Sequence, residues 1–226
     1  MPNIKAIANQ KKLEVAYIDN QDRVILRKDG SHAWRNTNPG NLSWIEGGFA
    51  SKHGAIGYDS SFAIFPDYQT GWDALNSLWH LKKYYDFPIS QGVSGHAPEK
   101  GGNNVEQYRK LVKQFTGLDI ERKVSSLSRE EYLSLMQAIQ RVEGWKEGQE
   151  FHPKRIVATK CMDKKKKSIT HYQIEGSSAW IPKAEAIGMV ERNEIYAVVV
   201  YAGKGAPYLK AHPDKEASNN LNSLKT

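Results

Sequence analysis

A change of hydrophobic periodicity near residue 148 constrains the fold of this 226-residue chain more than any other feature. Before that point, apolar side chains recur at the spacing of a helix face that packs on a core. The pattern predicts three helices, over residues 68–85, 105–116 and 128–142. Ser128 and Glu131 have the spacing of a capping box, and Gly144 is placed to end the third helix.

After residue 148 the pattern becomes that of short strands. Residues 155–158, 168–174 and 196–201 read as strands, and residues 182–191 read as a helix that begins at a proline. The sequence therefore predicts an α+β protein. We expect a mainly α-helical domain over residues 1–149, followed by a small ββαβ domain over residues 150–226.

Three segments of the first part lack a helical pattern. Residues 1–30 contain two short alternating runs around a polar turn, which predicts an N-terminal arm or hairpin. Residues 31–66 are dense in Gly, Asn, Ser and Trp and predict an ordered loop region, and residues 88–104 predict a polar, glycine-rich loop. Loops of this composition often carry function.

Composition and charge limit the partners and the location. The net charge of +7 favours polyanions, whether nucleic acid, membrane or cell wall. Lys164–Lys167 form the densest basic run, which reads either as a solvated turn between two strands or as a polyanion-binding loop. Cys161 is the only cysteine, so an intramolecular disulfide is impossible. No signal-peptide core or run of eighteen apolar residues occurs, so we expect synthesis in the cytoplasm without a cleaved signal and no membrane insertion.

The most distinctive motif is Arg-Asn-Thr-Asn-Pro-Gly-Asn-Leu at residues 35–42. The amides of Asn36, Asn38 and Asn41 either pin the backbone of a turn or donate and accept hydrogen bonds with sugar hydroxyl and N-acetyl groups. Arg35 either pairs with an internal carboxylate or binds a carboxylate of a substrate through two donors.

This motif resembles the R-N-N-N-P-G-N-I signature of phage virion-associated proteins and secreted bacterial effectors linked to cell-wall degradation. The resemblance spans about residues 31–147. It continues through residues 49–57, 62–65, Gly71, Ala74, Leu75, Ala97, Pro98, Asn103, Asn104, Tyr108, residues 137–139, Glu143 and Gly144. It implies a lysozyme-like fold and action on peptidoglycan, and it makes Tyr108 a substrate-binding candidate. Where family members often carry His-Glu-Asn-Gly, this chain has Val142, Glu143, Gly144 and Trp145, which keeps only the glutamate in place.

Cleavage of a glycosidic bond needs a carboxylic acid that protonates the leaving oxygen, sometimes with a second carboxylate. Glu143, at the end of an apolar helix and beside Trp145, is the candidate acid, and we expect the helix dipole and the aromatic wall to favour its protonated form. A surface glutamate at a helix end is the alternative. Glu46 is the preferred second carboxylate and Asp59 the other.

The remaining candidates have structural alternatives of similar weight. His53 either binds substrate or is a hydrogen-bonded structural histidine. Aromatic residues of the first domain either line a sugar-stacking groove or belong to the core; they are Trp34, Trp44, Tyr58, Trp72 and Trp79. No metal-ligand spacing or phosphate-binding loop is present, so we expect no metal and no cofactor.

The C-terminal part, over about residues 154–225, resembles a small bacterial domain family of unknown function that ends in a Y-L-R, P-D and N-N-L motif. The matching residues are Lys183–Ile187, Glu194, Ile195, Pro207–Lys210, Pro213, Asp214 and Asn219–Leu224. The resemblance implies a ββαβ fold and no activity.

These observations predict a peptidoglycan glycosidase, a muramidase or lytic transglycosylase, that acts as a phage lysin or as an antibacterial toxin, a type VI secretion effector. Its expected partners are peptidoglycan and an immunity protein or a secretion or tail component, and it would act in the periplasm or wall of a target cell or within a virion. The first alternative is a wall-binding virion or secretion component without activity, favoured by the change at Val142 and Gly144. The second is a polyanion-binding adaptor, although a basic recognition helix for nucleic acid is missing.

Overall fold

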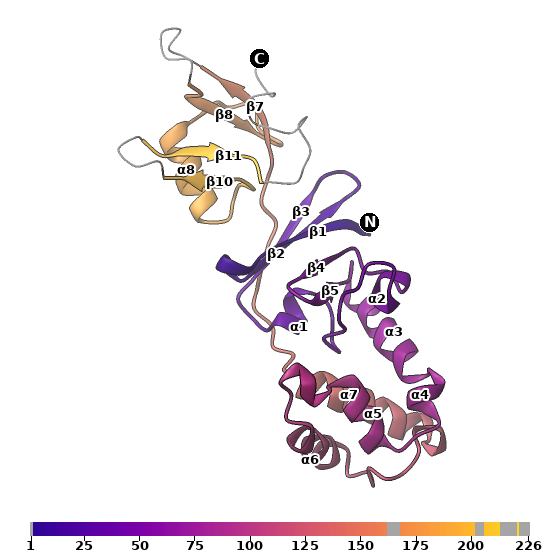
Figure 1. The fold of residues 1–226 in the computed structure, drawn as a ribbon. Coiled ribbons are helices and arrows are strands. Elements are labelled where there is room, and N and C mark those ends of the chain that lie inside the picture. The colour runs from indigo at the N-terminus through magenta and orange to yellow at the C-terminus, as the bar shows by residue number, and fades with distance from the viewer. Residues whose placement is uncertain (1, 162–167, 202–205, 213–220, 222–226) are drawn as a thin grey trace. The chain divides into compact units, whose positions relative to one another are not determined.

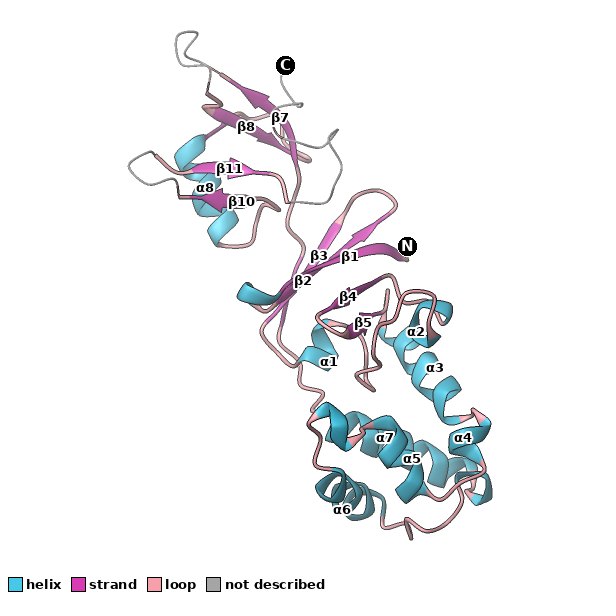
Figure 2. Cartoon of the chain, in the orientation of Figure 1, coloured by secondary structure: helices cyan, strands magenta, loops and turns pink. Residues whose placement is uncertain are grey.

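The computed structural model describes residues 2–161, 168–201, 206–212 and 221, and its fold is a mixture of helices and strands, as expected (Figures 1 and 2). The chain divides into two compact units. One, here called the helical unit, consists of residues 2–15 and 28–149. The other, here called the C-terminal unit, consists of the described parts of residues 16–27 and 150–226. The association of residues 16–27 with the C-terminal part is not indicated by the sequence pattern.

The helical unit contains most of the helices. In chain order its elements are β1 (Asn3–Asn9), η1 (Gln10–Lys12), α1 (His32–Arg35), α2 (Phe49–Lys52), β4 (Gly57–Asp59), β5 (Phe62–Ile64), α3 (Tyr68–Trp79), α4 (Lys82–Tyr85), α5 (Ile89–His96), η2 (Glu99–Gly101), α6 (Val105–Thr116), η3 (Val124–Ser126) and α7 (Arg129–Val142). The loop region expected over residues 31–66 thus holds two short helices and the β4–β5 hairpin.

The three expected helices are present, with one interruption. The segment expected as a single helix over residues 68–85 is α3 and α4, because Leu81 has an extended backbone conformation between them. Helix α6 begins after the side-chain cap of Asn104. Helix α7 begins with the full capping box of Ser128 and Glu131, and Gly144 follows its end with a positive φ of 75°.

Helix α5 (Ile89–His96) lies within the loop expected over residues 88–104, and for these residues the sequence-based expectation is wrong. Its glycines suggested a loop, yet Gly92 is required by packing, because a Cβ there would lie 2.6 Å from the Trp79 ring. Ile89 and Val93 of the same helix are fully buried. Burial against the core therefore outweighs the low helix propensity of the segment.

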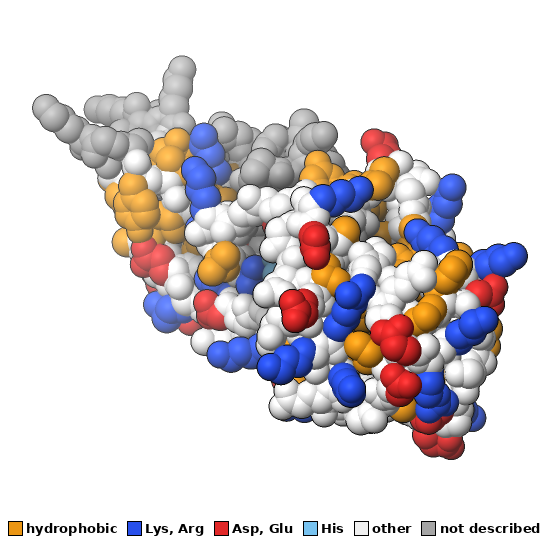
Figure 3. All heavy atoms as spheres, turned by 60° about the horizontal axis from the view of Figure 1, so that its bottom comes forward, with side chains coloured by type: hydrophobic (Ala, Val, Ile, Leu, Met, Phe, Trp, Pro, Cys, Tyr) orange, Lys and Arg blue, Asp and Glu red, His pale blue; other side chains and the backbone are white. Residues whose placement is uncertain are grey.

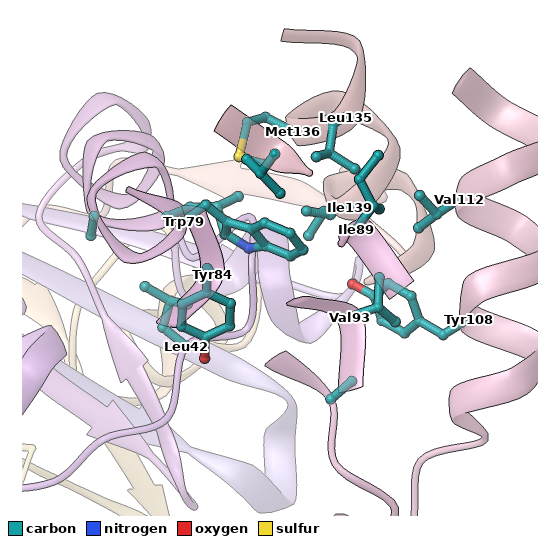
Figure 4. Close-up of a cluster of buried hydrophobic side chains, with 14 of the residues drawn as sticks. Leu42, Trp79, Tyr84, Ile89, Val93, Tyr108, Val112, Leu135, Met136 and Ile139 are labelled. Carbon is teal, nitrogen blue, oxygen red and sulfur yellow. The ribbon is translucent and has the colours of Figure 1, made fainter. Parts of the chain in front are cut away.

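The core of the helical unit joins α3, α5, α6 and α7 (Figure 4). Trp79 lies at its centre, in one cluster with Ile89 and Val93 of α5 and with Leu135 and Ile139 of α7. This packing fixes the ends of α5, α6 and α7 relative to one another, and those ends carry the candidate site.

Strands β2 (Glu14–Asp19), β3 (Val24–Lys28) and β6 (Gln149–Phe151) lie mostly in the C-terminal unit and are hydrogen-bonded neighbours in the order β2-β3-β6. The rest of the C-terminal unit comprises β7 (Ile156–Lys160), β8 (His171–Ile174), β9 (Ile181–Pro182), α8 (Lys183–Glu191), β10 (Val198–Val200) and β11 (Tyr208–Lys210). Strands β7, β8 and β9 form an antiparallel sheet, and β10 pairs with β11. Strands β9 and β11 add to the expected ββαβ pattern.

The C-terminal unit has a core of its own. Buried side chains of β7, β8 and β11 pack with Ala186 and Ile187 of α8. The Lys164–Lys167 run and the Pro213, Asp214 and Asn219–Asn220 part of the terminal motif lie outside the described residues, as do residues 222–226.

Candidate active site

Three side chains from distant parts of the helical unit meet at Glu143. Tyr108 of α6 donates its hydroxyl hydrogen to Glu143 Oε1 over 2.9 Å, and Nε2 of His96, at the end of α5, lies 3.3 Å from the same oxygen. Asn41 of the motif loop donates from Nδ2 to Glu143 Oε2 over 2.9 Å, and to the Glu143 carbonyl oxygen over 3.3 Å. The Glu143 side chain is 14% exposed, so the carboxylate is largely enclosed but not sealed.

These contacts set the charge of Glu143. Burial acts to raise its pKa, but the hydrogen bond and positive charge of His96, together with the donors Asn41 and Tyr108, outweigh burial and hold the pKa below its ordinary value. The expectation that helix end and aromatic wall would favour the protonated form is therefore wrong. The site holds a carboxylate ion at neutral pH, because three donors stabilise the charged form.

Tyr108 stays protonated in this environment. Burial and the neighbouring Glu143 charge raise the pKa of its hydroxyl well above the ordinary value. The hydroxyl therefore remains a hydrogen-bond donor over the whole physiological pH range, and Tyr108 is placed to hold the Glu143 carboxylate.

His96 was missed by the sequence reasoning as a site residue. Its side chain is 3% exposed, and its ring lies 6.0 Å from that of Trp79 and 6.3 Å from that of Tyr108. Forty-seven positions separate His96 from Glu143, so no local spacing connects them. The contact exists because α5 and α7 pack on the same core.

Most of the motif loop has a structural role. Asn38 donates to the carbonyl oxygens of Leu42 and Ala63, both over 2.9 Å, and accepts from the Leu42 backbone N–H over 2.8 Å. Arg35 donates from Nη1 to the carbonyl oxygens of Asp29 and Gly30. Both side chains are buried, so the turn-pinning alternative applies to Asn38, and Arg35 holds the turn that precedes α1.

Asn41 is the motif residue that reaches the carboxylate. Its φ is +44°, in the left-handed region that asparagine tolerates better than most residues. Its Oδ1 is buried and has no hydrogen-bond partner within the described part of the chain. A strained backbone and an unfilled acceptor beside a carboxylate are typical of a functional site.

The remaining predicted site residues lie elsewhere. Glu46 is exposed in the loop before α2. His53 is held by its own helix, because Nδ1 lies 2.8 Å from the Phe49 carbonyl oxygen and the two rings stack at 3.9 Å. Asp59 and Asn36 are buried around His32 rather than around Glu143.

The aromatic candidates divide between core and surface. Trp34 and Trp79 are buried, whereas Trp44 stacks at 5.7 Å on Tyr58, whose side chain is well exposed. Tyr68 stacks on Trp72 and packs edge-on against Trp145, two residues after Glu143. Tyr68 therefore joins Trp72 to Trp145, and of these three aromatic residues Trp145 is the one close to Glu143 in sequence.

The C-terminal part of the chain matches a known protein family. Residues 155–225 match the family described as Protein of unknown function (DUF3892). These residues are a DUF3892 domain, which confirms the expectation of a small C-terminal domain of unknown function. Among curated proteins, none matches the chain. The candidate site lies outside the DUF3892 domain, because Glu143 and its partners all precede residue 155.

Among the described residues, no three His, Cys, Asp or Glu side chains are grouped as a metal site requires, and no helix within the same ranges could span a membrane. On the face shown in Figure 3, basic and acidic side chains are interspersed, so the net charge does not form one continuous basic patch there.

Proposed function

We propose that the helical unit acts on peptidoglycan and cleaves its glycan strands at Glu143, as part of a phage lysin or a secreted antibacterial effector. One observation supports this most: Asn41 of the R-N-N-N-P-G-N-I-like motif donates to the carboxylate of Glu143, 102 positions later. The two most distinctive parts of the family resemblance therefore meet at one partly exposed acid. A lysozyme-like fold of the helical unit is part of this proposal.

The departure from the His-Glu-Asn-Gly pattern is compatible with this function. Gly144 has a positive φ, and glycine and asparagine are the two residues favoured at that position after a helix end. Val142 packs against the core. An imidazole is still present at the carboxylate, since His96 supplies one from α5.

Glu143 must gain a proton to act as the acid. A sugar that displaces the Asn41 and Tyr108 hydrogen bonds would raise the pKa of Glu143, because those donors stabilise its charged form. When His96 carries two protons, Nε2 is 3.3 Å from Oε1 and can transfer one to it. Substrate binding would thus convert the resting carboxylate into the acid that protonates the leaving oxygen.

A second candidate is a cell-wall-binding component without hydrolytic activity. Three hydrogen-bond donors surround the Glu143 carboxylate and lower its pKa. This observation favours the second candidate, because the contacts from Asn41 would also hold the motif loop against the end of α7 in a purely structural role. In this case Glu143 would be a cross-link of the fold.

The two functions are distinguished by incubating the full chain with purified peptidoglycan and measuring both products and binding. A glycosidase releases new muropeptides, detected by mass spectrometry, in an amount that grows with time. A binding component sediments with the wall and releases none. Failure both to release products and to sediment would overturn both proposals.

A further inference from the structure

A second polar cluster in the helical unit contains His32 and Asp59. Nε2 of His32, on α1, lies 2.8 Å from Asp59 Oδ2, at the end of β4. The Asp59 side chain is 5% exposed and that of His32 is 28% exposed. Phe62 packs edge-on against the imidazole at 4.9 Å, and Asn36 Nδ2 lies 3.4 Å from its Nε2. The buried Asp59 carboxylate thus contacts the His32 imidazole, which solvent can reach.

This geometry fixes the tautomer of the imidazole. Nε2 of His32 lies at hydrogen-bond distance from Asp59 Oδ2, a carboxylate oxygen that accepts and does not donate, and Asp59 Oδ1 is buried without a hydrogen-bond partner among the described residues. The ring must therefore donate its Nε2 hydrogen to the carboxylate, which leaves Nδ1 with a lone pair. Burial, and to a smaller degree the Arg35 charge, lower the pKa of His32, while Asp59 acts to raise it, and the net shift is downward. The ring is neutral at neutral pH and able to accept a proton.

The His32 cluster and the Glu143 cluster are joined by short connections. Ser31 is the residue before His32. Its Oγ accepts a hydrogen bond from the Lys146 backbone N–H, and its backbone N–H donates to the Lys146 carbonyl oxygen. Lys146 is three residues after Glu143. The motif loop adds a second link, because Asn36 contacts His32 and Asn41 contacts Glu143. Both clusters therefore lie by the C-terminal end of α7.

We infer that His32, oriented by Asp59, is the proton acceptor of the reaction in which Glu143 is the proton donor. The inference rests on the proposed glycan cleavage. A hydroxyl oxygen, of water or of the sugar, bonds to the anomeric carbon as the glycosidic C–O bond breaks. His32 Nδ1 takes the hydroxyl proton, and the leaving oxygen takes the proton of Glu143, so that charge and protons balance. Asp59 is a positioning residue that holds the ring and stabilises the imidazolium.

The competing interpretation is a structural cross-link between α1 and β4. Such a link would contribute to folding but would have no influence on how the reaction rate depends on pH. A pH profile therefore separates the two interpretations.

The test measures muropeptide release by the full chain between pH 5 and 8, for the wild type, His32→Gln, Asp59→Asn and the control His152→Gln, whose imidazole is largely exposed. We expect His32→Gln to lower kcat by about 100-fold or more and to abolish the acidic limb of the profile. Asp59→Asn should move that limb to lower pH, because the carboxylate acts to raise the pKa of His32. The control should behave as the wild type.

Each outcome has a distinct meaning. If the wild type releases no muropeptides, the proposed function fails and this inference fails with it. If the wild type is active and His32→Gln keeps both its rate and its pH profile, the inference is overturned while the proposed function stands. Should His32→Gln not fold, as judged by circular dichroism, an unmoved acidic limb in Asp59→Asn overturns the inference.

Discussion

Glu143 shows how neighbouring donors can reverse the effect of burial on a carboxyl group. An enclosed carboxyl group with no partners is held neutral, whereas Glu143 has His96, Asn41 and Tyr108 within hydrogen-bonding or ion-pair distance. The outcome is a charged group inside a helical core, prepared for proton transfer from an adjacent imidazole. The same contacts link its protonation to the stability of the fold.

The pKa of Glu143 gives a prediction about acid stability. Since the folded pKa is below the unfolded value of about 4.3, the stabilisation is fully present above that value and is lost as pH falls through the folded pKa. We therefore expect the unfolding free energy of the wild type to fall more steeply below about pH 4.3 than that of Glu143→Gln. Denaturant titrations from pH 7 to pH 3 measure this difference, and parallel curves would contradict the assigned direction.

Asn38 gives a second prediction at the residue scale. Its buried amide makes three hydrogen bonds to the backbone. Asn38→Ala would leave the Ala63 carbonyl oxygen and the Leu42 N–H without these partners, whereas the Leu42 carbonyl oxygen would keep the hydrogen bond from the Ala63 N–H. We expect a loss of about 2–4 kcal/mol in the free energy of unfolding. Asn103→Ala, which removes one exposed hydrogen bond to the Pro98 carbonyl oxygen, is the control and should cost under about 1 kcal/mol. Similar losses in the two variants would contradict the structural role of Asn38.

The asparagines of the motif mark the limit of inference from sequence. Turn formation and sugar binding use the same amide groups, so the sequence left both roles open for Asn36, Asn38 and Asn41. Asn38 is part of a turn, and Asn41 reaches a carboxylate 102 positions away. Only the packing of α7 against the loop separates the two roles, and that packing is a tertiary property.

At the scale of elements, the motif loop is held in place by the start of α3. Thr37, in the loop, has a φ of +48°, which is unusual for a β-branched residue, and its hydroxyl donates to the Phe65 carbonyl oxygen. Gly71 of α3 lies directly against the loop backbone. The strained loop conformation therefore depends on the close approach of α3.

Gly71→Ala tests this dependence. A Cβ at this position would lie 2.0 Å from the Thr37 carbonyl oxygen, so the helix and the loop would have to move apart. We expect a loss of about 3 kcal/mol or more in the free energy of unfolding. Gly117→Ala is the control: Gly117 follows the end of α6 in open space, so only backbone strain of about 1–2 kcal/mol is expected. Equal losses would show that α3 does not constrain the loop.

The helices show which elements sequence patterns can and cannot predict. Helices α6 and α7 have strong apolar stripes and recognisable caps, and the predictions for them are confirmed. Helix α5 has neither feature. It forms because Gly92 packs closely against the ring of Trp79 in the core. The composition of the segment alone is that of a loop. His96 remained unrecognised as a site residue for the same reason, since it is the last residue of α5.

At the scale of the whole molecule, the hairpin of residues 16–27 is separated in sequence from the rest of its unit. Ala16, Val24 and Leu26 form a small buried cluster, against which Phe151 and Tyr196 pack. This contact explains why the strands of the hairpin belong with the C-terminal part and not with the residues on either side of them. A sequence-based boundary near residue 149 cannot show such an arrangement.

Leu26→Ala tests this assignment. Removing a side chain that is buried in the cluster should destabilise the C-terminal unit by about 2–4 kcal/mol. We expect hydrogen exchange of the amides in β7 and β8 to accelerate, while the amides of α3 and α7 keep their protection. Acceleration confined to α3 and α7 would place the hairpin with the helical unit instead.

The central claim is that Glu143 is the reacting carboxylate of a peptidoglycan glycosidase. Its most direct test is mass-spectrometric comparison of muropeptides released by the wild type, by Glu143→Gln and by Glu147→Gln, a matched control at an exposed glutamate four residues away. We predict release by the wild type and the control and a loss of about 100-fold or more in Glu143→Gln, with folding checked by circular dichroism. Equal release by all three proteins would contradict the claim and move the chemistry to another residue.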